Sequence, residues 1–217
     1  NAQLQRFEQA GFTRQPCSVV YNAEPISVEH KADLWQGQRP MQIGFIATLS
    51  EGKGVINLIR AFKMLQGDFC LTIGGKAVSE MFHQHILQEA GDDPRIRIVG
   101  YADTEQFFRH SDLAVVPSIV HESFGLVAVE ACAKGVPVIA ADRGGLTEII
   151  THGANGLHCR PEDPAAIAAA IQSLYDNPDL YSRLAGATHH HIQRFTDTGA
   201  MVAELEQICY STLTHQP

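Results

Sequence analysis

The chain has 217 residues, 45% of them hydrophobic and 18% charged, which is the balance of an ordinary folded domain with a hydrophobic core. Its formal net charge of -8 argues against a nucleic-acid partner, because non-specific nucleic-acid binding needs a basic face. The same charge does not exclude an anionic ligand, since backbone amides can bind phosphate whatever the net charge.

The five cysteines are widely spaced and form no CxxC pair, which is typical of a reduced cytosolic protein and not of a disulfide scaffold or a zinc site. The sequence contains no run of about 18 apolar residues, so no membrane span is predicted. The N-terminus lacks the basic-then-apolar layout of a signal peptide. Because the chain begins with Asn1 rather than Met, we expect it to be part of something longer.

From residue 41 onward, short apolar runs alternate with stretches of helical periodicity. The runs rich in Val, Ile or Phe predict buried strands at residues 42–47, 69–73, 96–99, 113–116 and 136–140, with a short edge strand at 157–159. Helices are predicted between them at residues 55–65, 79–90, 104–110, 124–134 and 145–150. This alternation predicts an α/β fold, in which an open parallel sheet is built with right-handed crossovers.

Both ends of the chain depart from this pattern. Residues 17–21 are predicted as a further strand, and residues 30–40 as a polar connector. Towards the C-terminus, three helices without intervening strands are predicted at residues 163–175, 178–194 and 198–213. We expect the last helices to pack outside the sheet or to reach toward another domain.

The loop at residues 117–125 carries the most informative pattern. An open parallel sheet binds its ligands at the carboxyl ends of its strands, and this loop follows a predicted strand and leads into a helix. The free N–H groups and the dipole of that helix start attract phosphate. Gly125 would let the backbone approach a ligand closely.

Two carboxylates accompany this helix start. Glu122 precedes it, where a carboxylate could accept hydrogen bonds from sugar hydroxyls, and Glu130 lies about 12 Å further along an α-helix. Groups so far apart cannot share one substrate atom, but they could hold the sugar and the ribose of an extended ligand with phosphate between. The structural alternative is that Glu122 caps the helix and Glu130 is solvated. Glu130 stands among small apolar residues, where a charge needs a partner, and spacing alone leaves both interpretations open.

The stretch from Glu122 to Glu130 resembles the E-x7-E motif of the retaining group 1 glycosyltransferases, which have a two-domain GT-B fold. Further motifs of the family lie before and after this stretch, in the order that the family has them: Ser50-Glu51-Gly52-Lys53-Gly54-Val55, Pro117-Ser118, residues 130–140, Gly144-Gly145 with Glu148-Ile149, and Asn155-Gly156-Leu157. The resemblance covers the chain from about residue 17 onward. It implies the C-terminal half of a GT-B fold, namely a Rossmann-like parallel sheet with helices on both faces and a helical C-terminal tail.

In this family the C-terminal domain binds a nucleoside-diphosphate sugar. The resemblance places Glu122, the predicted catalytic residue, at the donor sugar hydroxyls, Glu130 at the ribose and Lys53 at the pyrophosphate, a role that suits a mobile point charge. The full predicted donor-binding set is Thr48, Lys53, Tyr101, Ser118, Glu122, Ser123, Phe124, Gly125, Leu126 and Glu130. No metal or cofactor is expected, because the helix dipole and basic side chains take a cation's role at the diphosphate.

The chain departs from the family at its first loop. Family members usually carry a Gly-Arg pair where this sequence has Ala47-Thr48, and the arginine helps to bind the diphosphate. Thr48 offers a hydroxyl without charge, which predicts about 1.5–3 kcal/mol less donor binding. The segment Gly74-Gly75-Lys76 has two interpretations, a cleft lining and a tight turn, of which the turn is favoured.

The leading hypothesis is the donor-binding domain of a hexosyltransferase-like retaining enzyme, which transfers a sugar from a nucleoside-diphosphate sugar to an acceptor. Residues 1–16 are then an interdomain segment or a remnant of a missing N-terminal acceptor-binding domain, residues 17–197 the nucleotide-sugar-binding domain, and residues 198–217 a helix that reaches toward the missing domain. We expect the chain to be inactive without that domain.

Two alternatives stay open. The change at Thr48 motivates a degenerate, non-catalytic nucleotide-sugar-binding module, and a GT-B-type sugar-nucleotide epimerase fits the motif spacing less well. The expected location is cytoplasmic, or peripheral at the inner face of a membrane for the full-length protein. The sequence does not identify the nucleobase, the sugar or the acceptor.

Overall fold

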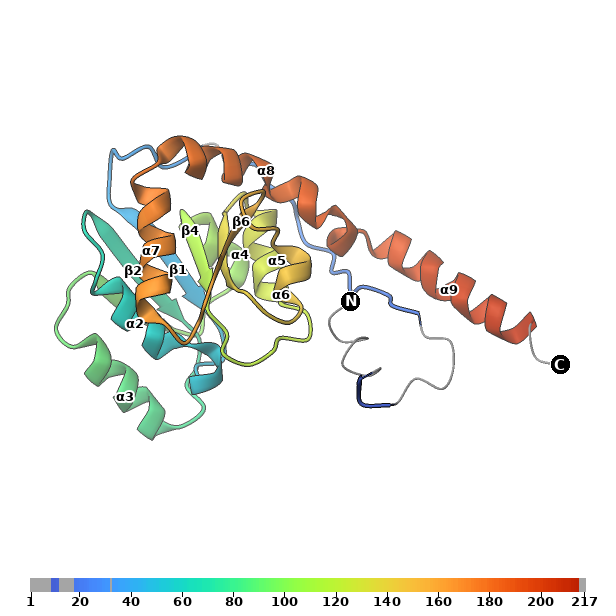
Figure 1. The fold of residues 1–217 in the computed structure, drawn as a ribbon, viewed down its shortest axis with the longest axis horizontal. Helices are drawn as coiled ribbons and strands as arrows, with labels where there is room; N and C mark the ends of the chain where they lie inside the picture. The colour runs from blue at the N-terminus through green and yellow to red at the C-terminus, as the bar shows by residue number, and fades with distance from the viewer. Residues whose placement is uncertain (1–8, 12–17, 32, 215–217) are drawn as a thin grey trace.

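The computed structural model describes residues 9–11, 18–31 and 33–214. Within them a single sheet of parallel strands contains β1 (Met41–Ile46), β2 (Phe69–Gly74), β3 (Ile96–Gly100), β4 (Leu113–Val116), β5 (Val138–Ala141) and β6 (Gly156–Cys159). The strand order is β3-β2-β1-β4-β5-β6, so the chain runs outward from β1 to one edge and then returns to build the other half (Figure 1). The reversal between β1 and β4 is the switch point at which such sheets bind ligands.

Helices cover both faces of this sheet, as Figure 1 shows. One face carries α2 (Val55–Phe62), α3 (Glu80–Ala90) and α7 (Pro164–Tyr175), and the other carries α4 (Thr104–Arg109), α5 (Leu126–Ala133) and α6 (Leu146–Ile149). Successive strand residues point to opposite faces, so that Ile139 belongs to one buried cluster and Ala140 to the other. The predicted Rossmann-like open parallel sheet is therefore confirmed, including the edge strand β6.

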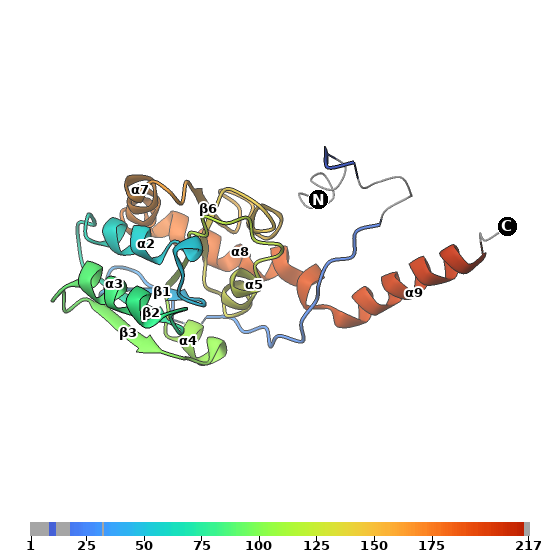
Figure 2. The same cartoon turned by 90° about the horizontal axis from the view of Figure 1, so that it is seen from below.

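The helical C-terminal tail is also confirmed. α8 (Pro178–Thr196) packs against α5 and α7 and contributes buried side chains to both clusters. α9 (Thr198–Thr214) extends away from the sheet, as Figure 2 shows from a second direction. Of the helices in the described residues, none is both long enough and apolar enough to cross a bilayer.

The prediction of a strand at residues 17–21 is wrong for residues 18–21, which make no strand pairing. Cys17 lies outside the described residues. The segment contacts α8 instead of joining the sheet. The Tyr21 ring packs edge-on against Phe195 at 5.4 Å, and the Glu24 N–H donates to the Phe195 carbonyl oxygen at 3.1 Å. Tyr21 is thus used in packing against α8, and the apolar pattern alone cannot distinguish such packing from a strand.

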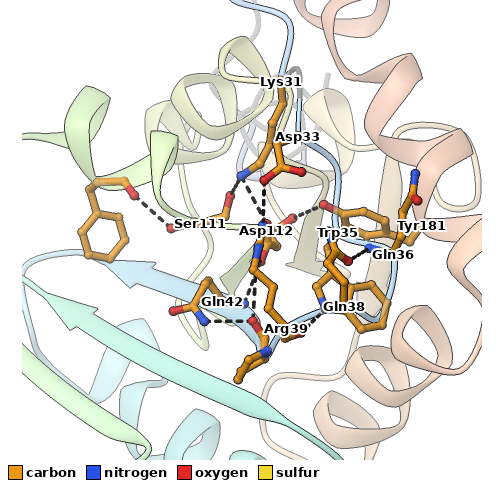
Figure 3. A network of polar contacts seen from close by, with 12 residues as sticks. Lys31, Asp33, Trp35, Gln36, Gln38, Arg39, Gln42, Ser111, Asp112 and Tyr181 are labelled. Carbon is orange, nitrogen blue, oxygen red and sulfur yellow. Dashed lines mark hydrogen bonds and ion pairs between the residues drawn. The ribbon is translucent and has the colours of Figure 1, made fainter.

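Asp112 fixes the predicted connector to the amino edge of the sheet, opposite the carboxyl ends of the strands (Figure 3). Its side chain is 1% exposed and accepts hydrogen bonds from the Arg39 guanidinium and, at 2.9 Å, from the Gln42 N–H. Lys31 Nζ lies 3.3 Å from the same carboxylate. Burial lowers the pKa of Lys31, and the charge of Asp112 opposes that shift. The Tyr181 hydroxyl donates to the Asp112 carbonyl oxygen at 3.2 Å, which ties α8 to the network.

Candidate functional site

The loops that follow β1 and β4 are packed against each other at the carboxyl edge of the sheet. The Gly52 carbonyl oxygen accepts hydrogen bonds from the N–H groups of Ile119, at 2.9 Å, and Val120, at 3.2 Å. Gly54 approaches the second loop so closely that a Cβ atom there would lie 2.0 Å from the Pro117 carbonyl oxygen. Its φ of +75° is also a left-handed conformation that favours glycine. The segment that carries Lys53 and Gly54 is therefore held beside the loop that carries Glu122.

The loop after β5 supports the same region from the other side. The Gly145 N–H donates to the Glu122 carbonyl oxygen at 2.8 Å. Arg143 donates to the Ile119 carbonyl oxygen at 3.0 Å and pairs with Glu162 through both of its terminal nitrogens. The Gly-Gly motif and Arg143 thus hold the backbone of the Glu122 loop. Sequence reasoning did not single out Arg143, because its partner Glu162 is a distant residue beyond β6.

Three predicted site residues meet in one cluster ahead of α5. The Glu122 Oε1 atom accepts hydrogen bonds from Lys53 Nζ at 2.5 Å and from Ser118 Oγ at 2.6 Å. Ser118 is buried, whereas the side chains of Lys53 and Glu122 are 31% and 17% exposed. The cluster offers a carboxylate acceptor and an ammonium donor to a ligand at the sheet edge.

The helix start itself presents backbone rather than side-chain groups. Gly125 occupies the N-cap position of α5 with φ +112°, and it has no side chain to cap the first-turn N–H groups. Ser123 is exposed and Leu126 is 37% exposed. The Phe124 ring is half-buried and packs edge-on against Phe195 at 5.3 Å, beside the hydrophobic core. This packing uses the Phe124 ring and leaves its backbone available to a ligand.

Glu130 is half-buried on α5, one turn and more beyond the helix start. Its Oε1 accepts a hydrogen bond from Thr104 Oγ1 at 2.9 Å. Burial raises the pKa of this carboxyl group, the Thr104 hydroxyl lowers it, and the charge of Asp103 adds to the rise. The partner that the apolar setting required is thus a neutral hydroxyl from α4. Sequence reasoning did not single out Thr104, because nothing in the E-x7-E motif points to α4.

The other two predicted residues, Thr48 and Tyr101, lie outside these clusters, at the ends of β1 and β3. Both are exposed, and Tyr101 is 91% exposed. Tyr101 and Gly100 line a hollow of about 450 Å³, together with Gly75 and Lys76 from the end of β2. The segment after β2 therefore borders a cavity at the carboxyl edge and is not only a turn. Among the described residues, no group of three or more His, Cys, Asp or Glu side chains is arranged to hold a metal ion.

These features define a Rossmann-like α/β domain whose loops gather at the carboxyl edge beside the switch point of the sheet. The chain belongs to the group 1 glycosyltransferases, since the family described as "Glycosyl transferases group 1" matches residues 29–191. A glycogen synthase of Mycobacterium tuberculosis is 31% identical over 179 residues, which are 78% of this chain and 42% of that protein.

Solved structures agree with this assignment. Anabaena Alr3699/HepE in complex with UDP and glucose superposes with a TM-score of 0.72 at 27% identity, over 81% of this chain and 49% of that chain. The C-terminal domain of a group 1 family protein, LpcC from Francisella tularensis, gives a TM-score of 0.64 at 26% identity, over 78% of this chain and 94% of that domain. The chain thus spans less than half of the glycogen synthase and about half of HepE.

Proposed function

We propose that the carboxyl edge of the sheet binds a nucleoside-diphosphate sugar, and that the chain is the donor-binding, C-terminal half of a retaining, hexosyltransferase-like enzyme. The observation that carries this proposal is the cluster of Lys53, Ser118 and Glu122 directly ahead of α5. It puts a cation, a carboxylate and the free N–H groups of a helix start in one place. A donor needs these three groups, for its phosphates and for its sugar hydroxyls.

The contacts define what each residue would do on binding. Lys53 is held by Glu122 in the free chain, and a pyrophosphate would take over part of that interaction. Glu122 would then accept hydrogen bonds from the sugar hydroxyls while Ser118 keeps its carboxylate in place. Glu130 would accept hydrogen bonds from the ribose, and its half-buried setting strengthens such bonds. The Ser123 to Leu126 backbone would meet the phosphate.

Transfer to an acceptor would need an N-terminal half in addition to these residues. Two comparisons support this division, because the chain covers 49% of HepE and 94% of the LpcC C-terminal domain. The HepE structure is a complex with UDP and glucose, which makes UDP-glucose the first donor to test. We infer that this chain binds a donor but transfers no sugar by itself. This inference holds equally for a cytoplasmic protein and for one that lies against a membrane.

One observation favours a second candidate function, a non-catalytic nucleotide-sugar-binding module. Thr48 is exposed at the carboxyl end of β1 and brings no charge to the site. Such a module would bind the donor as proposed but would transfer no sugar even when an N-terminal half is supplied.

Titration calorimetry with UDP-, GDP- and ADP-glucose tests the proposed site. We expect one of them to bind the wild type and to bind Glu130→Ala more weakly. Glu204→Ala, on the exposed surface of α9, is the matched control and should bind like the wild type. The proposal fails if none of the three donors binds, or if Glu130→Ala binds as tightly as the control.

A further inference from the structure

The loops after β1 and β2 stay paired beyond the ends of their strands. The Leu49 N–H donates to the Lys76 carbonyl oxygen at 2.9 Å, and Leu49 and Ala77 form a parallel bridge. The strands pair Ile46 with Gly74 in the same register. Thr48 therefore lies opposite Lys76, although the two residues are far apart in the sequence.

Gly75 brings these loops into direct contact. Its φ is +124°, and a Cβ atom at this position would lie 1.8 Å from the Ala47 carbonyl oxygen. The Val78 N–H adds a hydrogen bond to the Leu49 carbonyl oxygen at 3.0 Å. The backbone of Lys76 is thus anchored from both sides, while its side chain is exposed and lines the 450 Å³ hollow beside Tyr101.

The positive charges at this edge of the sheet differ in whether they are already neutralised. Lys53 is paired with Glu122, Arg143 with Glu162, and Arg160, which follows β6, with Asp163. In the described part of the chain, Lys76 makes no ion pair with an acidic side chain. An incoming anion can therefore engage Lys76 without displacing a carboxylate.

We propose that Lys76 binds a phosphate of the nucleoside diphosphate and supplies the charge that Thr48 does not. This inference rests on the proposed function, since it assumes that the donor occupies the same edge. A diphosphate carries negative charge on both phosphates, and Lys53 alone, paired with Glu122, does not balance it. A lysine ammonium on a flexible stem can reach a phosphate as a point charge from an anchored backbone. The hollow beside it leaves room for the nucleoside.

The wild type is first titrated calorimetrically with UDP, ADP and GDP. The diphosphate that it binds most tightly is then titrated into each variant at several salt concentrations. We expect Lys76→Ala to weaken binding about tenfold or more and to reduce its salt dependence. Lys76→Arg should retain both affinity and salt dependence. Lys63→Ala, which removes an exposed lysine beyond the far end of α2, is the control and should leave both unchanged.

Each outcome decides the question. Unchanged affinity in Lys76→Ala overturns the inference, and so does weaker binding with the wild-type salt dependence, which would indicate a structural role. If the wild type binds none of the three diphosphates, the proposed function itself fails, and this result is distinct from a failure at Lys76.

Discussion

Replacing Gly54 with alanine would force apart the two loops that carry Lys53 and Glu122. Gly54 has φ +75°, and a Cβ atom would lie 2.0 Å from the carbonyl oxygen and 3.0 Å from the carbonyl carbon of Pro117. These are backbone atoms, which cannot rotate out of the way as a side chain could. One loop must therefore move, and the 2.5 Å contact between Lys53 Nζ and Glu122 Oε1 would be lost with it.

Two costs add in this variant. An alanine in the left-handed region costs about 1–2 kcal/mol, and an extra carbon forced into a packed contact costs about 1–3 kcal/mol. We therefore expect Gly54→Ala to lower the free energy of unfolding by about 2–5 kcal/mol. Gly186→Ala is the matched control, because Gly186 lies within α8 and a Cβ atom there would meet nothing within 4 Å. This control should raise the free energy of unfolding by about 0.5–1 kcal/mol.

Urea unfolding gives both free energies, with the slopes checked for equality. A UDP titration of the folded protein then reports the site, and Gly54→Ala should bind more weakly than Gly186→Ala. The reasoning is refuted if Gly54→Ala is as stable as the wild type and binds UDP equally well. That result would mean that the loops after β1 and β4 do not need their close contact.

Three further predictions concern the site and the opposite edge of the sheet. Thr48→Arg adds a charge next to Lys76. In calorimetry this variant should bind UDP at least about tenfold more tightly than the wild type. An unchanged affinity would mean that no phosphate reaches this loop. Asp112→Asn leaves Lys31 and Arg39 without their shared carboxylate. We expect the free energy of unfolding, measured in urea, to fall by about 3–5 kcal/mol. A loss of about 1 kcal/mol or less, as for a surface ion pair, would contradict this prediction. Because burial raises the pKa of Glu130 above 4.5, UDP-glucose binding should weaken as the pH falls toward that raised pKa, and Glu130→Gln should lose this pH dependence. The same shift stabilises the fold below pH 4.5, a contribution that is lost as the pH rises through the raised pKa. A wild-type binding profile that matches Glu130→Gln would contradict the role of the carboxylate.

The fold could be predicted from the sequence because the inner strands β1, β4 and β5 are buried almost throughout and therefore appear as continuous apolar runs, whereas the edge strand β3, which was also expected to be buried, alternates half-buried and exposed residues. β5 shows how closely this works, since residues 136–140 were expected and Val138–Ala141 is observed. The segment at residues 18–21 shows the limit. Tyr21 of this segment packs on Phe195 of α8, and an apolar run does not reveal which element covers it.

The candidate site was predictable as a set of residues but not as a set of contacts. The motif singles out Glu122 and Glu130, whereas the hydroxyl of Thr104 and the register that sets Lys76 opposite Thr48 depend on tertiary structure. Phe124 shows the converse case, because a residue within the motif packs its ring against Phe195 of the core. Spacing along one helix cannot show which neighbouring element supplies a partner.

The central claim, that the carboxyl edge of the sheet binds a nucleoside-diphosphate sugar, is tested most directly by mapping backbone amide NMR shifts during titration with UDP-glucose. The account predicts shifts in the loops at residues 48–54, 75–79, 100–104 and 117–126. The amino edge also has a hollow, of about 440 Å³, which is lined in part by Lys31, Arg39, Arg109 and Lys134 and should show no shifts. Shifts concentrated around that hollow, with the loops at the carboxyl edge unchanged, would contradict the account.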